Sequence, residues 1–146
     1  MVTTLYRMEG EPAMGDGKSG TFIDVPEYVW YTDAVEWTAA YEIVMGYGDG
    51  TFGPDDKISR EQLAAMLYRY AEYKDYDVSV SEDTDLQAYA DASAVSEYAV
   101  TAMQWAMENG IITGRTADTL NPKDTATRAE LATILMRFTE TFTAEE

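Results

Sequence analysis

The sequence contains no cysteine and no histidine, and each absence removes a class of chemistry. Without cysteine, neither a disulfide bond nor a thiolate metal site can form. Without histidine, the commonest general base and metal ligand is missing, which excludes catalytic triads and zinc sites in their usual forms. Our expectation for this chain is no catalytic residue, no metal and no cofactor.

Basic residues are also scarce, because ten lysines and arginines face 27 aspartates and glutamates and leave a formal net charge of −17. Binding to phosphate groups needs clustered lysine and arginine, so nucleic acid and anionic membrane surfaces are excluded as partners. No apolar run approaches the roughly 18 residues of a membrane span, and no signal peptide is visible at the start. We expect no membrane insertion, and a signal for export, if there is one, lies outside this sequence.

Apolar residues, by contrast, are plentiful, since 46% of the 146 residues are hydrophobic. This length and composition are typical of one domain with a core. The most informative stretch begins with a glycine-rich turn, Tyr47-Gly48-Asp49-Gly50, in which glycine permits a positive φ. Ser59 and Gln62 then have the spacing of a capping box, which predicts a helix that begins at Ser59. Apolar residues recur at steps of three and four along it, namely Leu63, Met66, Leu67 and Tyr70.

This stretch belongs to an internal repeat. A spacing of 68 residues, as from residue 37 to residue 105, separates many identical pairs, among them Trp37 and Trp105, Gly46 and Gly114, and Arg60 and Arg128. Thr127 and Glu130 repeat the capping box. Each copy has the pattern helix, loop, helix, and we expect the first helix from about Tyr31 to Tyr41 and from about Glu97 to Asn109.

The two copies span residues 22–73 and 86–142. Residues 1–9 share Leu-Tyr-Arg with the second helix of the first copy, which predicts that they are the end of a preceding unit. We predict a single all-α domain over residues 1–146, built from helix-loop-helix repeats.

Several spaced motifs recur in both copies and together resemble the S-layer homology (SLH) repeat. In the first copy they are Phe22-Ile23-Asp24-Val25, Trp30-Tyr31, the run from Gly46 to Pro54 and Ile58-Ser59-Arg60-Glu61. In the second copy they are Tyr89-Ala90-Asp91-Ala92-Ser93, Val95-Ser96-Glu97-Tyr98-Ala99 and Ala126-Thr127-Arg128-Ala129-Glu130. The resemblance covers nearly the whole chain.

The resemblance implies an all-helical module in which three repeats pack around a pseudo-threefold axis, here complete or truncated. In that family the grooves between repeats hold cell-wall polysaccharide, often with pyruvyl ketals, and anchor surface proteins to the cell envelope. The expected location is therefore extracellular, in the cell wall or at the cell surface. The chain departs from the pattern by having two full units and a remnant, by Arg115-Thr116-Ala117-Asp118 in place of the glycine-rich turn, and by Tyr98 in place of Trp30.

Arg60 and Arg128 are the first candidates for a binding site. Each occupies the first turn of a predicted helix, where the helix dipole disfavours a cation. One explanation is a bound anion, because free N–H groups at a helix start and a guanidinium together suit a carboxylate or phosphate. The alternative is an ion pair with an aspartate or glutamate of the neighbouring repeat.

The other candidates are aromatic residues and glycines. Trp30 and its counterpart Tyr98 are predicted to stack on a sugar ring, with core packing as the alternative for Trp30. Gly46, Tyr47 and Gly114 complete the predicted ligand-binding set, since a ligand can approach closely at glycine. Two further pairs are assigned to structure: Trp37 and Trp105 to the core, and Asp24 and Asp91 to capping a helix start or pairing with an arginine.

Three functions remain to be compared. The first is a noncatalytic anchor that binds anionic cell-wall polysaccharide. The second is a protein-interaction or self-assembly module, in which a homo-oligomer completes the missing repeat. The third, a glycan-cleaving enzyme with two carboxylates, has little support because 27 acidic residues always supply a suitable pair.

Overall fold

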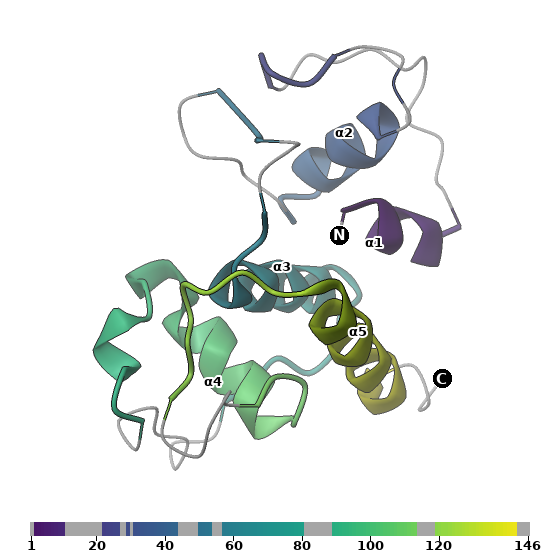
Figure 1. Ribbon diagram of the computed structural model, residues 1–146. Coiled ribbons are helices and arrows are strands. Elements are labelled where there is room, and N and C mark those ends of the chain that lie inside the picture. The colour runs from purple at the N-terminus through teal and green to yellow at the C-terminus, as the bar shows by residue number, and fades with distance from the viewer. Residues whose placement is uncertain are drawn as a thin grey trace. The chain divides into compact units, whose positions relative to one another are not determined.

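The computed structural model describes residues 2–10, 22–26, 29, 31–43, 50–53, 57–80, 89–113 and 119–142 (Figure 1). The described part is helical, as predicted, and its only strand-like pairing is a single bridge between Ser59 and Thr125. The chain forms two compact units, Met1–Asp56 and Lys57–Glu146. The boundary between the units falls inside the first sequence repeat, so the second helix of that repeat folds with the following repeat.

In the first unit, α1 (Val2–Met8) packs against α2 (Thr32–Ala40). Trp37 of α2 is fully buried, as predicted, and its ring lies 5.7 Å from the ring of Tyr6. Leu5, Val35 and Ile43 are buried as well. The residues predicted to end a preceding unit therefore form a helix whose apolar side is covered within this unit.

The second unit contains α3 (Arg60–Tyr73), the short 3-10 helices η2 (Ala92–Ala94) and η3 (Glu97–Ala99), α4 (Val100–Glu108) and α5 (Arg128–Phe142). Helix α3 packs against α4 and η3, and the segment before α5 runs along the start of α3 (Figure 1). The first helices of the two repeats begin at Thr32 and Val100. The predicted starts were therefore slightly early, and Glu97–Ala99 is a 3-10 turn instead of α-helix.

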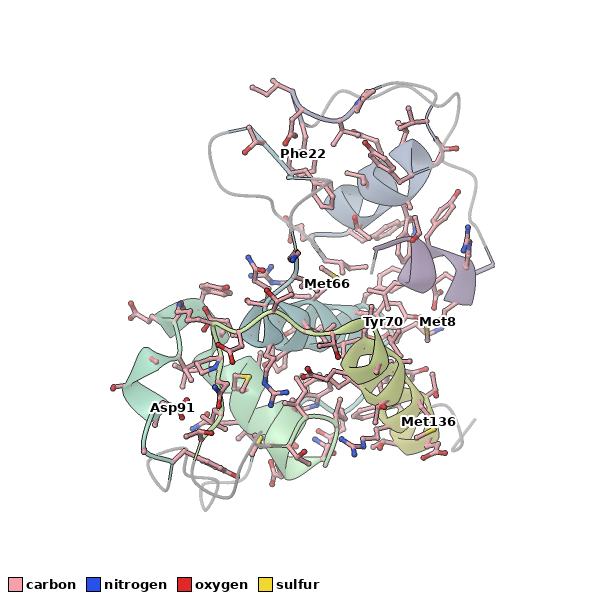
Figure 2. The ribbon with its side chains drawn as sticks, viewed as in Figure 1. Met8, Phe22, Met66, Tyr70, Asp91 and Met136 are labelled. Carbon is pink, nitrogen blue, oxygen red and sulfur yellow. The ribbon has the colours of Figure 1, made fainter. Side chains whose placement is uncertain are left out.

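Aromatic side chains fill the centre of the second unit. Trp105 is fully buried, as predicted, and stacks on Phe142 at a ring distance of 5.7 Å. Tyr70 of α3 lies 5.8 Å from Phe138 of α5, and Tyr70 is labelled in Figure 2. On the other side of α5, Met136 is 51% exposed. The predicted stripe on α3 is confirmed at Leu63, Leu67 and Tyr70, which are all buried, whereas Met66, the fourth predicted member, is partly exposed.

Both predicted capping boxes are present. The Ser59 hydroxyl accepts from the Gln62 N–H at 3.2 Å, while the Gln62 side chain accepts from the Ser59 N–H at 2.9 Å. Thr127 and Glu130 make the same reciprocal pair at 3.1 and 3.4 Å. Each box satisfies N–H groups that have no partner within the helix, which fixes where α3 and α5 begin.

Equivalent helices also end in the same way. After α2, the Ile43 N–H donates to the Thr38 carbonyl at 2.8 Å around Glu42, which has a φ of 59°. After α4, the Ile111 N–H donates to the Ala106 carbonyl at 2.9 Å around Gly110, with a φ of 69°. This is the Schellman arrangement, which favours glycine at the left-handed position. Glu42 adopts it because the buried residue that follows holds the turn closed.

Candidate functional site

Two equivalent aspartates each hold the loop that precedes the second helix of their repeat. Asp24 accepts from the N–H groups of Phe52 and Gly53 at 2.7 and 2.8 Å. Asp91, labelled in Figure 2, accepts from Leu120 and Asn121, both at 2.8 Å. Both oxygens of each carboxylate thus bind loop N–H groups, and these hydrogen bonds are not the predicted cap at a helix start. The predicted interaction with an arginine is present at Asp91, where the charge of Arg60 favours the ionised carboxylate.

The loops held by these aspartates share one backbone conformation. The second donor residue of each loop has a positive φ, 73° at Gly53 and 51° at Asn121. Asparagine tolerates this left-handed region better than most residues, so both positions suit the turn. The internal repeat seen in the sequence is thus also a repeat of loop geometry.

The carboxyl group of Asp91 has a lowered pKa. The main cause is its hydrogen bond from the Leu120 N–H, and the Asn121 N–H and the positive charge of Arg60 act in the same direction, although partial burial opposes them. Each of these donors stabilises the ionised form of the carboxyl group. The ionised carboxylate is therefore the form that holds the loop.

Replacing Asp91 with asparagine is expected to lower the free energy of unfolding by about 1 kcal/mol at pH 7, because an amide offers one acceptor to two N–H donors. The folded-state pKa lies below the ordinary value of 3.8, so the carboxylate stabilises the fold above that value and loses its effect as the pH falls through the folded-state pKa. Urea unfolding of both proteins at pH 7 and pH 3 measures this difference. A gap that stays constant at both pH values would contradict the assignment.

Arg60, at the first position of α3, is enclosed by the second repeat. It is 4% exposed, and its Nε donates to the Leu120 carbonyl at 2.9 Å. Its Nη1 pairs with a Glu130 carboxylate oxygen at 2.9 Å, and its Nη2 donates to the Thr113 carbonyl. This is the predicted alternative in which the arginine pairs with an acid of the neighbouring repeat. Arg60 thereby bonds to Thr113, directly before segment 114–118, and to Leu120, the second residue after it.

The first turn of α3 has no open N–H group. The Arg60 and Glu61 N–H groups donate to the carbonyls of Asp124 and Pro122 at 2.9 and 3.0 Å. The next two N–H groups, of Gln62 and Leu63, bond to the hydroxyl and the carbonyl of Ser59. The prediction of free N–H groups available to an anion at this helix start is therefore wrong, because the loop before α5 occupies them.

Glu61 forms the centre of a polar cluster beside this loop. The residue is 2% exposed, and its carboxylate accepts from the N–H and the hydroxyl of Ser96, both at 2.8 Å. Lys123 Nζ completes the set with an ion pair of 2.6 Å. Burial, followed by the charge of Glu61, raises the pKa of Tyr98. Several donors thus compensate the cost of burying this charge.

Of the seven predicted ligand-binding residues, the structure describes the side chains of two. Arg60 is bonded to Leu120, Thr113 and Glu130, whereas Tyr98 is 54% exposed. Arg128 is the first residue of α5, but its side chain lies outside the described part, as do Trp30, Gly46, Tyr47 and Gly114. Sequence reasoning missed Glu61, Ser96 and Lys123. The sequence did contain one sign that Glu61 is special: the two copies differ at this position, where the second copy has Ala129.

Within the described residues, no group of three or more acidic side chains is placed to hold a metal ion. The longest described helix has 15 residues, and none of the described helices has the length and apolar character that a membrane crossing requires.

Comparison with known proteins identifies the repeat. The S-layer homology domain matches residues 21–64 and 88–132. The chain is 37% identical over 102 residues to an endoglucanase of Bacillus sp. (strain KSM-635), covering 68% of this chain and 11% of that protein. It is 31% identical over 122 residues to the surface-layer 125 kDa protein of Lysinibacillus sphaericus, covering 82% of this chain and 10% of that protein.

A third relative is the cellulosome-anchoring protein of Acetivibrio thermocellus (strain ATCC 27405), which is 26% identical over 130 residues, covering 89% of this chain and 28% of that protein. The chain thus spans between a tenth and about a quarter of the length of these three relatives. Because the two matched segments together cover more than half of its residues, the protein belongs to the S-layer homology domain family of cell-surface proteins.

Proposed function

We propose that this chain is a noncatalytic module that anchors a larger protein to the cell surface by binding cell-wall polysaccharide. The observation that carries the proposal is the kind of relative that shares the segment. An endoglucanase, a surface-layer protein and a cellulosome-anchoring protein all match it over a minor part of their length. A segment common to such different proteins fits a shared means of attachment better than a shared reaction.

The finer proposal is that the polysaccharide is anionic, for example pyruvylated, and binds in grooves between repeats. The proposed ligand-binding residues are Trp30, Gly46, Tyr47, Arg60, Tyr98, Gly114 and Arg128. For Arg60 we propose a positioning role, because its guanidinium is bonded to the carbonyls of Thr113 and Leu120, which lie before and after Gly114 in the sequence.

A pull-down with purified secondary cell-wall polysaccharide tests the proposal. The native polymer and a sample stripped of its pyruvyl ketals by mild acid are compared on the same resin. We expect retention on the native polymer and markedly weaker retention on the stripped one. Absence of retention on the native polymer contradicts the anchoring function, and equal retention on both contradicts the requirement for the ketal. Release of reducing sugar by the purified chain would contradict a noncatalytic role.

The alternative is a self-assembly module without glycan binding, in which a homo-oligomer completes the repeat set. The sequence supports it because Arg115-Thr116-Ala117-Asp118 replaces the glycine-rich Tyr47-Gly48-Asp49-Gly50 of the first copy. Light scattering of the purified chain separates the two functions, because assembly predicts a mass that rises with protein concentration. A monomer that is retained on the polymer favours the anchor.

A further inference from the structure

A cavity of about 460 Å³ lies where α3, α4 and α5 end. Its wall includes Asp75 just after α3, Glu108 as the last residue of α4 and Phe142 as the last residue of α5. Its volume falls in the range of about 300 to 1,000 Å³ that small-molecule sites occupy. These residues all belong to the unit Lys57–Glu146, so the cavity is formed within one compact unit.

The charge around this cavity is negative. Asp75, Asp77 and Glu108 contribute carboxylates to the wall, and none of the described lining residues is a lysine or an arginine. The carboxyl-terminal ends of α3, α4 and α5 add the negative poles of three helix dipoles. Both sources of charge favour a cation and repel an acidic sugar.

Aromatic side chains give the same cavity an apolar wall. Tyr76 and Phe142 both line it, and their rings stack with centroids 5.3 Å apart and an angle of 11° between the planes. Aromatic rings attract cations and also offer contact area to hydrocarbon. A bare metal ion gains little from such a wall, and in the described part of the chain no three acidic side chains come together to hold one. The wall therefore suits a cation that carries its own apolar portion.

We propose that this cavity binds a small organic ammonium ion with an apolar stem, with its charge on the carboxylates of Asp75, Asp77 and Glu108 and its stem against Tyr76 and Phe142. An ammonium has only N–H donors and an ionised carboxylate has only acceptors, so the two are complementary. A neutral molecule of the same shape gains the apolar contact alone. The site goes beyond the proposed anchoring function, because it uses none of the residues proposed for polysaccharide binding and selects the opposite charge.

Nuclear magnetic resonance titration of the isotope-labelled chain with pentylammonium tests the proposal, since it measures affinity and locates the site. Pentanol and pentanoate are the neutral and anionic counterparts of the same stem, and magnesium chloride measures attraction of cations in general. The double variant Asp75→Asn with Asp77→Asn removes two charges. Asparagine suits the first position, where φ is 58°, and at the second its amide oxygen can still accept from the Ser79 N–H. Glu97→Gln removes an exposed acid outside the cavity as the matched control.

With pentylammonium we expect saturable shifts of the backbone amide signals of Asp75, Asp77 and Glu108. Pentanol should cause much smaller shifts, and pentanoate should cause none. The double variant should bind about fivefold more weakly, because each exposed charge pair contributes modestly. Glu97→Gln should bind like the wild type, and circular dichroism melting confirms that each variant is folded.

Three results would overturn the site. The first is equal affinity of the wild type and the double variant for pentylammonium. The second is an equal loss of affinity in Glu97→Gln, because the attraction would then come from the net charge of the whole chain. The third is that magnesium chloride shifts the same amide signals as strongly as pentylammonium, which would show an adventitious ion only.

Discussion

Replacing Arg60 with alanine is expected to lower the free energy of unfolding by about 3 kcal/mol. The guanidinium is 4% exposed and connects the start of α3 to the loop and helix of the second repeat through Leu120, Thr113 and Glu130. Removal leaves a carboxylate and two carbonyl oxygens without this donor. The loss of stability is limited at Glu130, because its side chain is 26% exposed and water can solvate the carboxylate once the guanidinium is gone.

Urea denaturation followed by circular dichroism measures the Arg60 effect. Lys57→Ala is the matched control, since it removes an exposed cation three residues earlier and should change stability by less than about 0.5 kcal/mol. Arg60→Lys should recover little, because an ammonium cannot reproduce the planar donor geometry of a guanidinium. Retention on polysaccharide should fall together with stability. Lost retention with unchanged stability would instead show that Arg60 contacts the ligand.

Replacing Lys123 with aspartate is expected to lower the free energy of unfolding by about 3 kcal/mol, because it removes the cation from a buried carboxylate and adds a like charge beside it. Glu61 and Lys123 are 2.6 Å apart, and the Glu61 side chain is 3% exposed. The same change at an exposed, unpaired lysine costs little. Lys57→Asp therefore serves as the control, and denaturation in urea gives both values.

The Lys123→Asp loss should depend on Glu61. In the sequence repeat, Glu61 of the first copy corresponds to Ala129 of the second, and Lys123 of the second copy corresponds to Asp55 of the first. The pair equivalent to glutamate and lysine is therefore alanine and aspartate. The double variant Glu61→Ala with Lys123→Asp should therefore be more stable than Lys123→Asp alone, with a coupling energy of about 2 kcal/mol. If the two single changes in the free energy of unfolding simply add up in the double variant, the charges of Glu61 and Lys123 are not coupled and the prediction is wrong.

Local features of the structure were predictable from the sequence because their causes lie a few residues apart. The Ser59 and Gln62 box starts α3, and three- and four-residue steps place Leu63 and Leu67 in the core. Trp37 and Trp105 were assigned to the core by their equivalent places in the middle of two helices, and both are fully buried. The repeat itself was visible as a constant spacing of identical residues.

The partners in the site could not be predicted in the same way. Arg60 donates to residues 53, 60 and 70 positions away, and Asp91 holds N–H groups 29 and 30 positions away. With 27 acidic residues, the sequence offered many partners for each arginine and no means of ranking them. The free N–H groups expected at the start of α3 were taken by a loop more than sixty residues later in the chain.

The sequence by itself determined the helical repeat, its capped helix starts and its family, since periodicity, capping and spaced motifs act over short range. Only the tertiary structure decided that the compact units cross the repeat boundary and that Arg60 is enclosed while Lys123 is exposed. The physical reason is that a charged side chain is defined by its solvent access and its partners, and both arise when segments distant in the chain come together.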